Sequence, residues 1–222
     1  MIERPIQFHF RGAIHRIDGL PPTHTVLRYL RETGLATGTK EGCNEGDCGA
    51  CTVVLGERDD EAPGGVRLAP ANACLLLLPM LDGKALFTVE DLASLAGGGL
   101  HPVQQALVEG HGSQCGFCTP GFTMALFALY ENHPDADRAQ VTDALAGNLC
   151  RCTGYRPIVD ALPVARARAR VALDRAPLRV ALDALATAPD LDYHAGGERF
   201  SAPRSLAALA AARLARPDAR LV

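Results

Sequence analysis

The sequence lacks the features of a membrane or secreted protein. Its longest apolar run, Leu75 to Leu81, is interrupted by Pro79 and is far too short to cross a bilayer. The stretch Met1 to Pro5 has neither an apolar core nor a small-residue cleavage site, so a secretory signal is not expected. We therefore expect a soluble protein of the cytoplasm, with no membrane partner.

The chain also lacks a strong charge of either sign. The 22 Lys and Arg residues and 25 Asp and Glu residues give a net charge of -3 and an isoelectric point of about 6.2. This balance offers no electrostatic basis for binding nucleic acid. The seven histidines show no ligand spacing, and no nucleophile–base pair is recognisable, so no catalytic residue is assigned.

The N-terminal part has the pattern of a small α+β fold. Apolar residues at 6, 8 and 10 alternate with polar ones, which is typical of a half-buried strand. Thr23 or Thr25 would cap a short helix that carries Val26, Leu27 and Leu30. Strands are expected at 6–10, 13–17, 52–55, 66–68 and 86–89, and residues 37–49, rich in glycine, should form a loop.

After Glu90 the pattern becomes helical. Helices are expected from His101 to about Gly110, from Thr119, from Asp137 to Leu145, and from Pro157 towards Ala172. Four such helices suffice for a small bundle. Residues 176–198 are rich in Ala, Asp and Pro without clear periodicity, which favours a linker.

Eight cysteines form two sets of four. The first set has the spacing Cx4CxxC, followed after 22 residues by a fourth cysteine, and consists of Cys43, Cys48, Cys51 and Cys74. This is the spacing of a plant-type [2Fe–2S] site. One tight loop can supply three thiolates, and the glycines at 42, 46 and 49 would let its backbone approach the sulfurs.

The second set pairs a CxxC with a CxC 31 residues later, and consists of Cys115, Cys118, Cys150 and Cys152. A helix should start at Thr119, directly after the first pair. Another should end at Gly147, directly before the second pair. Two helix-terminal loops can therefore face each other and present two thiolates each.

Zinc and disulfides are the alternatives. Four-cysteine zinc sites usually consist of two CxxC pairs, which neither set has, although a zinc-stabilised scaffold module stays open. Disulfides fit poorly with a chain that has no recognisable secretory signal.

Three segments, 40–53, 114–121 and 148–157, resemble the iron–sulfur region of the xanthine oxidase family of molybdenum hydroxylases. The resemblance covers roughly residues 5 to 165, and all eight cysteines match ligand positions. Within that family, the stretches that begin at His101 and Gly112 are most similar to the small subunit of bacterial xanthine dehydrogenases.

The resemblance implies an α+β fold with two cluster domains. Residues 1–90 would form a β-grasp, plant-ferredoxin-like domain that holds the [2Fe–2S] cluster farther from molybdenum. Residues 91–175 would form an all-α four-helix domain that holds the nearer cluster. After the linker at 176–198, residues 199–222 would open an incomplete FAD-binding domain, so the chain is either a fragment or has its flavin domain encoded separately.

The resemblance also implies the partners. Gln114 and Cys152 would lie beside the pterin of a molybdenum cofactor that a large partner subunit binds. FAD would belong to the complete subunit or to a partner, NAD+ would be the final acceptor, and the assembly would be an (αβ)2 hetero-oligomer. The expected function is electron transfer in a xanthine dehydrogenase that converts xanthine to urate, with an aldehyde, CO or N-heterocycle hydroxylase as the alternative.

Overall fold

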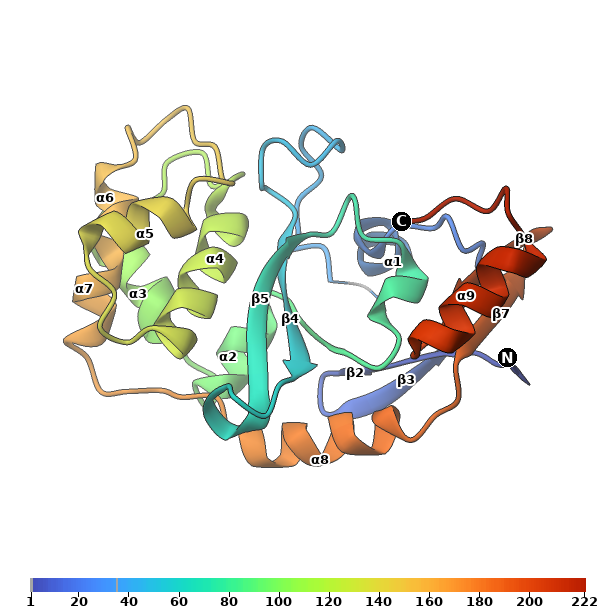
Figure 1. Cartoon of the computed structure of the whole chain (residues 1–222). Coiled ribbons are helices and arrows are strands. Elements are labelled where there is room, and N and C mark those ends of the chain that lie inside the picture. Colours follow the sequence, from blue (N-terminus) through green and yellow to red (C-terminus); the bar gives the residue numbers. More distant parts are fainter. Residues whose placement is uncertain (1, 35) are drawn as a thin grey trace.

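The first half of the chain forms a five-stranded sheet crossed by a helix (Figure 1). The computed structural model describes residues 2–34 and 36–222. The strands are β2 (Ile6–Phe10), β3 (Ala13–Ile17), β4 (Thr52–Arg58), β5 (Val66–Asn72) and β6 (Ala85–Phe87). Their order is β3-β2-β6-β4-β5, with β2 and β6 parallel and the other pairs antiparallel.

The alternation of apolar and polar residues in β2 decides which of its side chains are buried. Ile6, Phe8 and Phe10 are buried at 0 to 1% exposure, and helix α1 (Val26–Glu32) packs on them with its own apolar side chains. Thr25 caps α1, since its side chain accepts the N–H of Arg28 at 3.2 Å. The α+β prediction for this half is confirmed.

The segment from residue 91 to residue 166 is helical. It contains α2 (Asp91–Leu95), α3 (Pro102–Glu109), α4 (Thr119–Asn132), α5 (Arg138–Ala144), α6 (Arg156–Val159) and α7 (Ala161–Arg166). The predicted fourth helix is two short ones and ends at Arg166, not near Ala172. Pro163 lies in the first turn of α7, where its missing N–H leaves no intrahelical bond unmade.

Helix α4 is the element that both halves share. It is buried over eleven consecutive residues, from Gly121 to Glu131. Phe122 and Leu126 face the helical bundle, whereas Met124 and Phe127 belong to a separate apolar cluster with the sheet. The sheet domain and the helical domain therefore pack tightly on opposite sides of one helix.

The linker predicted at 176–198 is wrong. Helix α8 (Arg175–Ala186) buries Leu178, Leu182 and Leu185 against the sheet, and in Figure 1 it runs along the bottom of the molecule. Those three leucines have the i, i+4, i+7 spacing of a helix face, which the many alanines around them obscure.

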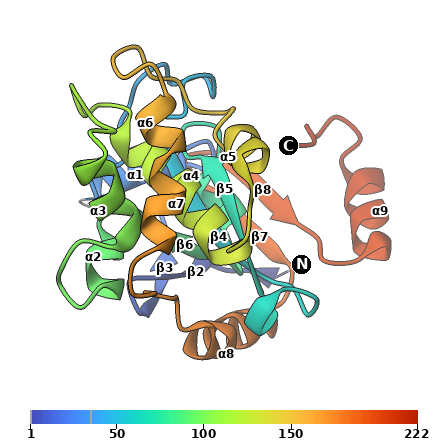
Figure 2. The same ribbon diagram turned by 90° about the vertical axis from the view of Figure 1, so that its left-hand side faces the viewer.

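A second, three-stranded sheet follows α8. Strand β7 (Leu191–Ala195) pairs in parallel with β1 (Ile2–Glu3) and antiparallel with β8 (Glu198–Ala202). Helix α9 (Leu206–Ala215) comes last, has no buried residues and stands apart from the other elements in Figure 2. Two short 3-10 turns, η1 (Pro63–Gly65) and η2 (Leu78–Leu81), complete the described elements. Among the described residues, no helix is both long and apolar enough to cross a membrane.

Candidate metal centres

The first cysteine set lies on the loop between α1 and β4 and just after β5. The N–H of Cys43 donates to the Sγ of Cys48 at 3.4 Å, and the N–H of Cys48 donates to the Sγ of Cys43 at 3.3 Å. Cys51 and Cys74 are buried, and their thiols interact with each other. The set therefore consists of an outer pair, Cys43 and Cys48, and an inner pair, Cys51 and Cys74.

The two pairs differ in electrostatics. Backbone hydrogen bonds from Glu45 and Cys48 lower the pKa of Cys43 to about 7, which favours its thiolate. Burial raises the pKa of Cys51 to about 12, and the neighbouring Cys74 thiol adds to the shift. A cation at the inner pair would reverse this preference, because a coordinating thiol is deprotonated.

Two glycines, Gly42 and Gly46, lie where the loop backbone packs too tightly for a side chain. A Cβ at Gly42 would lie 2.8 Å from the Sγ of Cys48. Gly46 has a φ of +81°, and a Cβ there would lie 2.2 Å from the Cδ1 of Leu75. The side-chain amide of Asn72 donates to the carbonyl of Gly46 at 2.7 Å and fixes the loop over β5. A side chain at Gly42 would therefore occupy the space beside the Cys48 sulfur, and one at Gly46 would collide with Leu75.

The second set lies on the two helix-terminal loops that the sequence predicts. Cys115 and Cys118 come between α3 and α4, and Cys150 and Cys152 come between α5 and α6. The sulfurs of Cys115 and Cys152 are 3.6 Å apart and exposed, while Cys118 interacts with the buried Cys150. This set also has an outer and an inner pair.

The inner pair of the second set is unequal. Burial raises the pKa of Cys118 to about 12, with the Cys150 thiol as a further cause. Burial also acts on Cys150, but hydrogen bonds from Thr153, whose hydroxyl is 3.2 Å from the sulfur, outweigh it and lower that pKa. The Tyr155 hydroxyl accepts the N–H of Cys150 at 2.9 Å and holds this loop in place. The sequence reading did not identify Thr153 or Tyr155, which follow the CxC in an otherwise polar loop.

The pairing fits a two-iron cluster better than a single ion. A zinc ion would gather four sulfurs around one point at about 2.3 Å. Over residues 2–34 and 36–222, no group of three or more His, Cys, Asp or Glu side chains is placed to hold a single metal ion. Two pairs per set match a cluster with two irons and four cysteine ligands.

Gln114 lies in the sequence next to Cys115 and is exposed, as Cys152 is. The structure thus places both residues predicted to contact a pterin at the exposed side of the second cysteine set. Figure 1 shows the loops of both sets at the same end of the molecule, above the sheet and the bundle.

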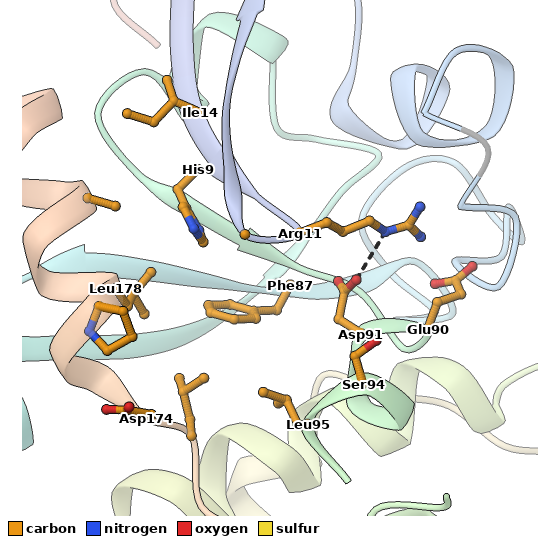
Figure 3. Close-up of a pocket in the computed structure, with 14 residues that line it drawn as sticks. His9, Arg11, Ile14, Phe87, Glu90, Asp91, Ser94, Leu95, Asp174 and Leu178 are labelled. Carbon is orange, nitrogen blue, oxygen red and sulfur yellow. Dashed lines mark hydrogen bonds and ion pairs between the residues drawn. The ribbon is translucent and has the colours of Figure 1, made fainter. Parts of the chain in front are cut away.

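A cavity of about 900 Å³ lies elsewhere, between the β2–β3 hairpin, β6, α2 and α8 (Figure 3). Phe87, Leu95 and Leu178 make its wall largely apolar, and an ion pair between Arg11 and Asp91, with 3.1 Å between nitrogen and oxygen, stands beside it. None of the eight cysteines lines this cavity, so the thiol sites are a separate feature of the fold.

Comparison with known protein families agrees with the two-site geometry. Residues 9–78 match a "2Fe-2S iron-sulfur cluster binding domain", and residues 88–163 match a "[2Fe-2S] binding domain". Each match contains one complete cysteine set. The fold is thus a β-grasp domain followed by a helical domain, each of a [2Fe–2S]-binding type.

Curated full-length proteins similar to this chain include an aldehyde oxidase and a xanthine dehydrogenase. It is 51% identical to human aldehyde oxidase over 154 residues, which is 69% of this chain and 11% of that protein. It is 49% identical to the xanthine dehydrogenase of Emericella nidulans over 158 residues, or 70% of this chain and 11% of that one. The chain therefore spans about one ninth of the length of these two curated relatives.

Solved structures show the same architecture. Quinoline 2-oxidoreductase from Pseudomonas putida 86 superposes with a TM-score of 0.61 at 33% identity, covering 73% of this chain and 93% of that chain. The aldehyde oxidoreductase of Desulfovibrio desulfuricans gives a TM-score of 0.62 at 33% identity, covering 74% of this chain and 17% of that one.

Fold and cysteine sites together define an iron–sulfur electron-transfer protein with two [2Fe–2S] clusters. The chain belongs to the xanthine oxidase family of molybdenum hydroxylases, whose iron–sulfur part it represents.

Proposed function

We propose that this chain carries electrons in a xanthine dehydrogenase, from a molybdenum cofactor that oxidises xanthine to urate towards FAD and NAD+. The eight cysteines would be the ligands: Cys43, Cys48, Cys51 and Cys74 for one cluster, and Cys115, Cys118, Cys150 and Cys152 for the other. When bound, the clusters would supply one-electron transfer, and the chain itself would carry no bond chemistry.

The observation that supports this proposal is the division of each cysteine set into an outer and an inner pair. The exposed sulfurs of Cys115 and Cys152 would face the partner that binds molybdenum, with Gln114 beside the pterin. The buried inner pairs keep part of each site away from water, and burial is one of the levers that set a cluster potential.

The surrounding assembly follows from the same proposal. A large subunit would bind molybdenum, a flavin domain or subunit would accept the electrons, and the whole would form an (αβ)2 hetero-oligomer in the cytoplasm, where thiols stay reduced. The predicted boundaries, with cluster domains at 1–90 and 91–175 and a flavin-domain start at 199–222, remain part of this proposal.

Metal analysis and electron paramagnetic resonance test the electron-transfer role. The purified chain should be brown, contain about four irons and give two distinct rhombic signals on reduction. A colourless chain that contains zinc in place of iron would overturn the proposal.

A second candidate keeps the same role but changes the substrate. Both the aldehyde oxidase and the xanthine dehydrogenase above share about half of their aligned residues with this chain. An aldehyde, CO or N-heterocycle hydroxylase is therefore the competing assignment. Assays of the purified complex with xanthine, an aldehyde, quinoline and CO decide between them. Turnover of an aldehyde without turnover of xanthine would overturn the xanthine assignment alone.

A further inference from the structure

The two cysteine loops are joined directly, across the boundary between the domains. Asn148 is only 5% exposed, and its side-chain amide donates to the carbonyl of Gly49 at 2.9 Å and to the hydroxyl of Thr52 at 3.1 Å. The N–H of Leu149 donates to the carbonyl of Cys48 at 2.9 Å. Cys48 belongs to the first set, and Leu149 directly precedes Cys150 of the second.

Two glycines where the cysteine loops meet, Gly49 and Gly121, leave no room for a side chain. A Cβ at Gly121, in the first turn of α4, would lie 2.1 Å from the carbonyl oxygen of Gly49. A Cβ at Gly49 would lie 2.3 Å from the carbonyl oxygen of Gly147. A Cβ at Gly147 itself would meet nothing within 4 Å. The contact is therefore tight at Gly49 and Gly121 and open at Gly147.

The domains do not depend on Asn148 to stay together. Met124 and Phe127 of α4 pack on Val54 and Leu68 of the sheet in one apolar cluster. Such packing fixes the relation of the domains, whereas the buried amide acts only on the tips of the two loops. Loss of this buried amide would remove one donor from the carbonyl of Gly49, which would keep the Thr52 hydroxyl at 2.7 Å. The Leu149–Cys48 hydrogen bond would still join the loops, so we expect the loops to shift relative to each other but not to separate.

We propose that Asn148 is a positioning residue that fixes the separation of the two cysteine loops and so sets the electronic coupling between the two clusters. The inference rests on the proposed function. One electron leaves one cluster and enters the other, so the first is oxidised and the second reduced. No bond forms or breaks, and no proton needs to move. The molybdenum cofactor is the reductant of this relay, and the flavin is its oxidant.

The test uses the full chain with both clusters loaded and compares Asn148→Ala with Gly147→Ala. Gly147 is the preceding residue, and a methyl group added there would meet nothing within 4 Å. When both clusters are reduced, each paramagnet should broaden the signal of the other and speed its relaxation. This effect weakens steeply as the clusters separate. We expect Asn148→Ala to keep about four irons and both signals but to lose much of the mutual broadening. Gly147→Ala should leave it unchanged.

Gly121→Ala disturbs the same junction without removing the Asn148 side chain, since its methyl would lie 2.1 Å from the carbonyl oxygen of Gly49 and 3.1 Å from the amide nitrogen of Asn148. It should lower the broadening as well. If Asn148→Ala cannot hold its iron, the milder Thr52→Val, which removes one partner of the amide, takes its place in the comparison.

Unchanged broadening in these iron-loaded variants would overturn the inference, as would an unaltered chain whose two reduced signals do not affect each other. Either result would leave the two-cluster function standing. A chain that takes up no iron would instead overturn the proposed function, so the two failures are distinguishable.

Discussion

At the scale of single residues, the cysteine sites depend on groups that are not ligands. Glycine at 42 and 46 leaves room for the sulfurs and for Leu75, and Thr153 and Tyr155 hydrogen-bond to Cys150. A ligand set can be complete in the sequence and still fail if these neighbours change, because surrounding hydrogen bonds orient the ligands and tune the metal.

Gly42→Ala should damage the first site alone, because its methyl would lie 2.8 Å from the Sγ of Cys48. Iron content should fall from about four to about two per chain, with one of the two resonance signals lost. The matched control is Gly99→Ala, whose methyl would meet only the carbonyl oxygen of Ala96 at 3.7 Å. Iron analysis and the reduced spectrum check it, and a full complement of iron in Gly42→Ala would contradict the steric argument.

Serine substitutions test the proposed order of the two sites within the whole complex. Cys43→Ser should impair delivery of electrons to the flavin and leave the molybdenum site assembled. Cys152→Ser should harm both, because this exposed residue is proposed to touch the pterin. Flavin reduction by substrate, together with molybdenum content, measures the two effects. Equal losses in the two variants would show that the assigned order is wrong.

At the scale of elements, α8 is a structural part of the sheet domain and not a tether. Leu182 is 1% exposed within the cluster that joins α8 to the sheet, whereas Val180 on the same helix is 70% exposed. We therefore expect the buried face of α8, and not its exposed face, to stabilise the fold.

Leu182→Ala should destabilise the protein by about 2–5 kcal/mol, since it leaves a cavity between helix and sheet. That loss corresponds to a melting temperature lower by roughly 4 °C or more. Val180→Ala, the control on the exposed face, should change stability by no more than about 0.5 kcal/mol. Thermal unfolding of the iron-loaded chain measures both. Equal, small effects would mean that α8 behaves as the linker first predicted from its composition.

At the scale of the whole molecule, α4 packs against both cluster domains, and we expect the two domains to unfold as one unit. Phe127 is fully buried, lies 6.4 Å between ring centroids from Phe87 of the sheet, and packs edge-on against His101 at 5.4 Å. The same helix begins directly after Cys118 and contributes Phe122 to the bundle core. A substitution on the sheet-facing side of α4 should therefore destabilise both cysteine sets.

Phe127→Ala should cost about 3–5 kcal/mol, and the visible absorption of both clusters should bleach in a single, earlier thermal transition. Circular dichroism followed alongside the absorption tests whether secondary structure and clusters are lost together. Two separate transitions, with only the helical domain affected, would show that the domains unfold independently.

Much of the site could be predicted because its information is local. The Cx4CxxC and CxC spacings, the glycines between ligands and the helix starting at Thr119 all lie within short stretches, where thiolate spacing and backbone freedom decide the outcome. The strands at 6–10 and 13–17 also agree with the structure to the residue, because alternation along a strand is a local pattern.

The sequence by itself thus determined which residues could hold two clusters and which fold class carries them. Only the tertiary structure decided which thiols pair, where α8 lies, and that Asn148 reaches Gly49, 99 residues earlier in the chain. Those features depend on the packing of surfaces that are distant in sequence, and no periodicity or spacing encodes a contact that forms only when α4 brings two domains together. The eight cysteines specify two sites, and the packing around α4 brings the loops that carry them into contact.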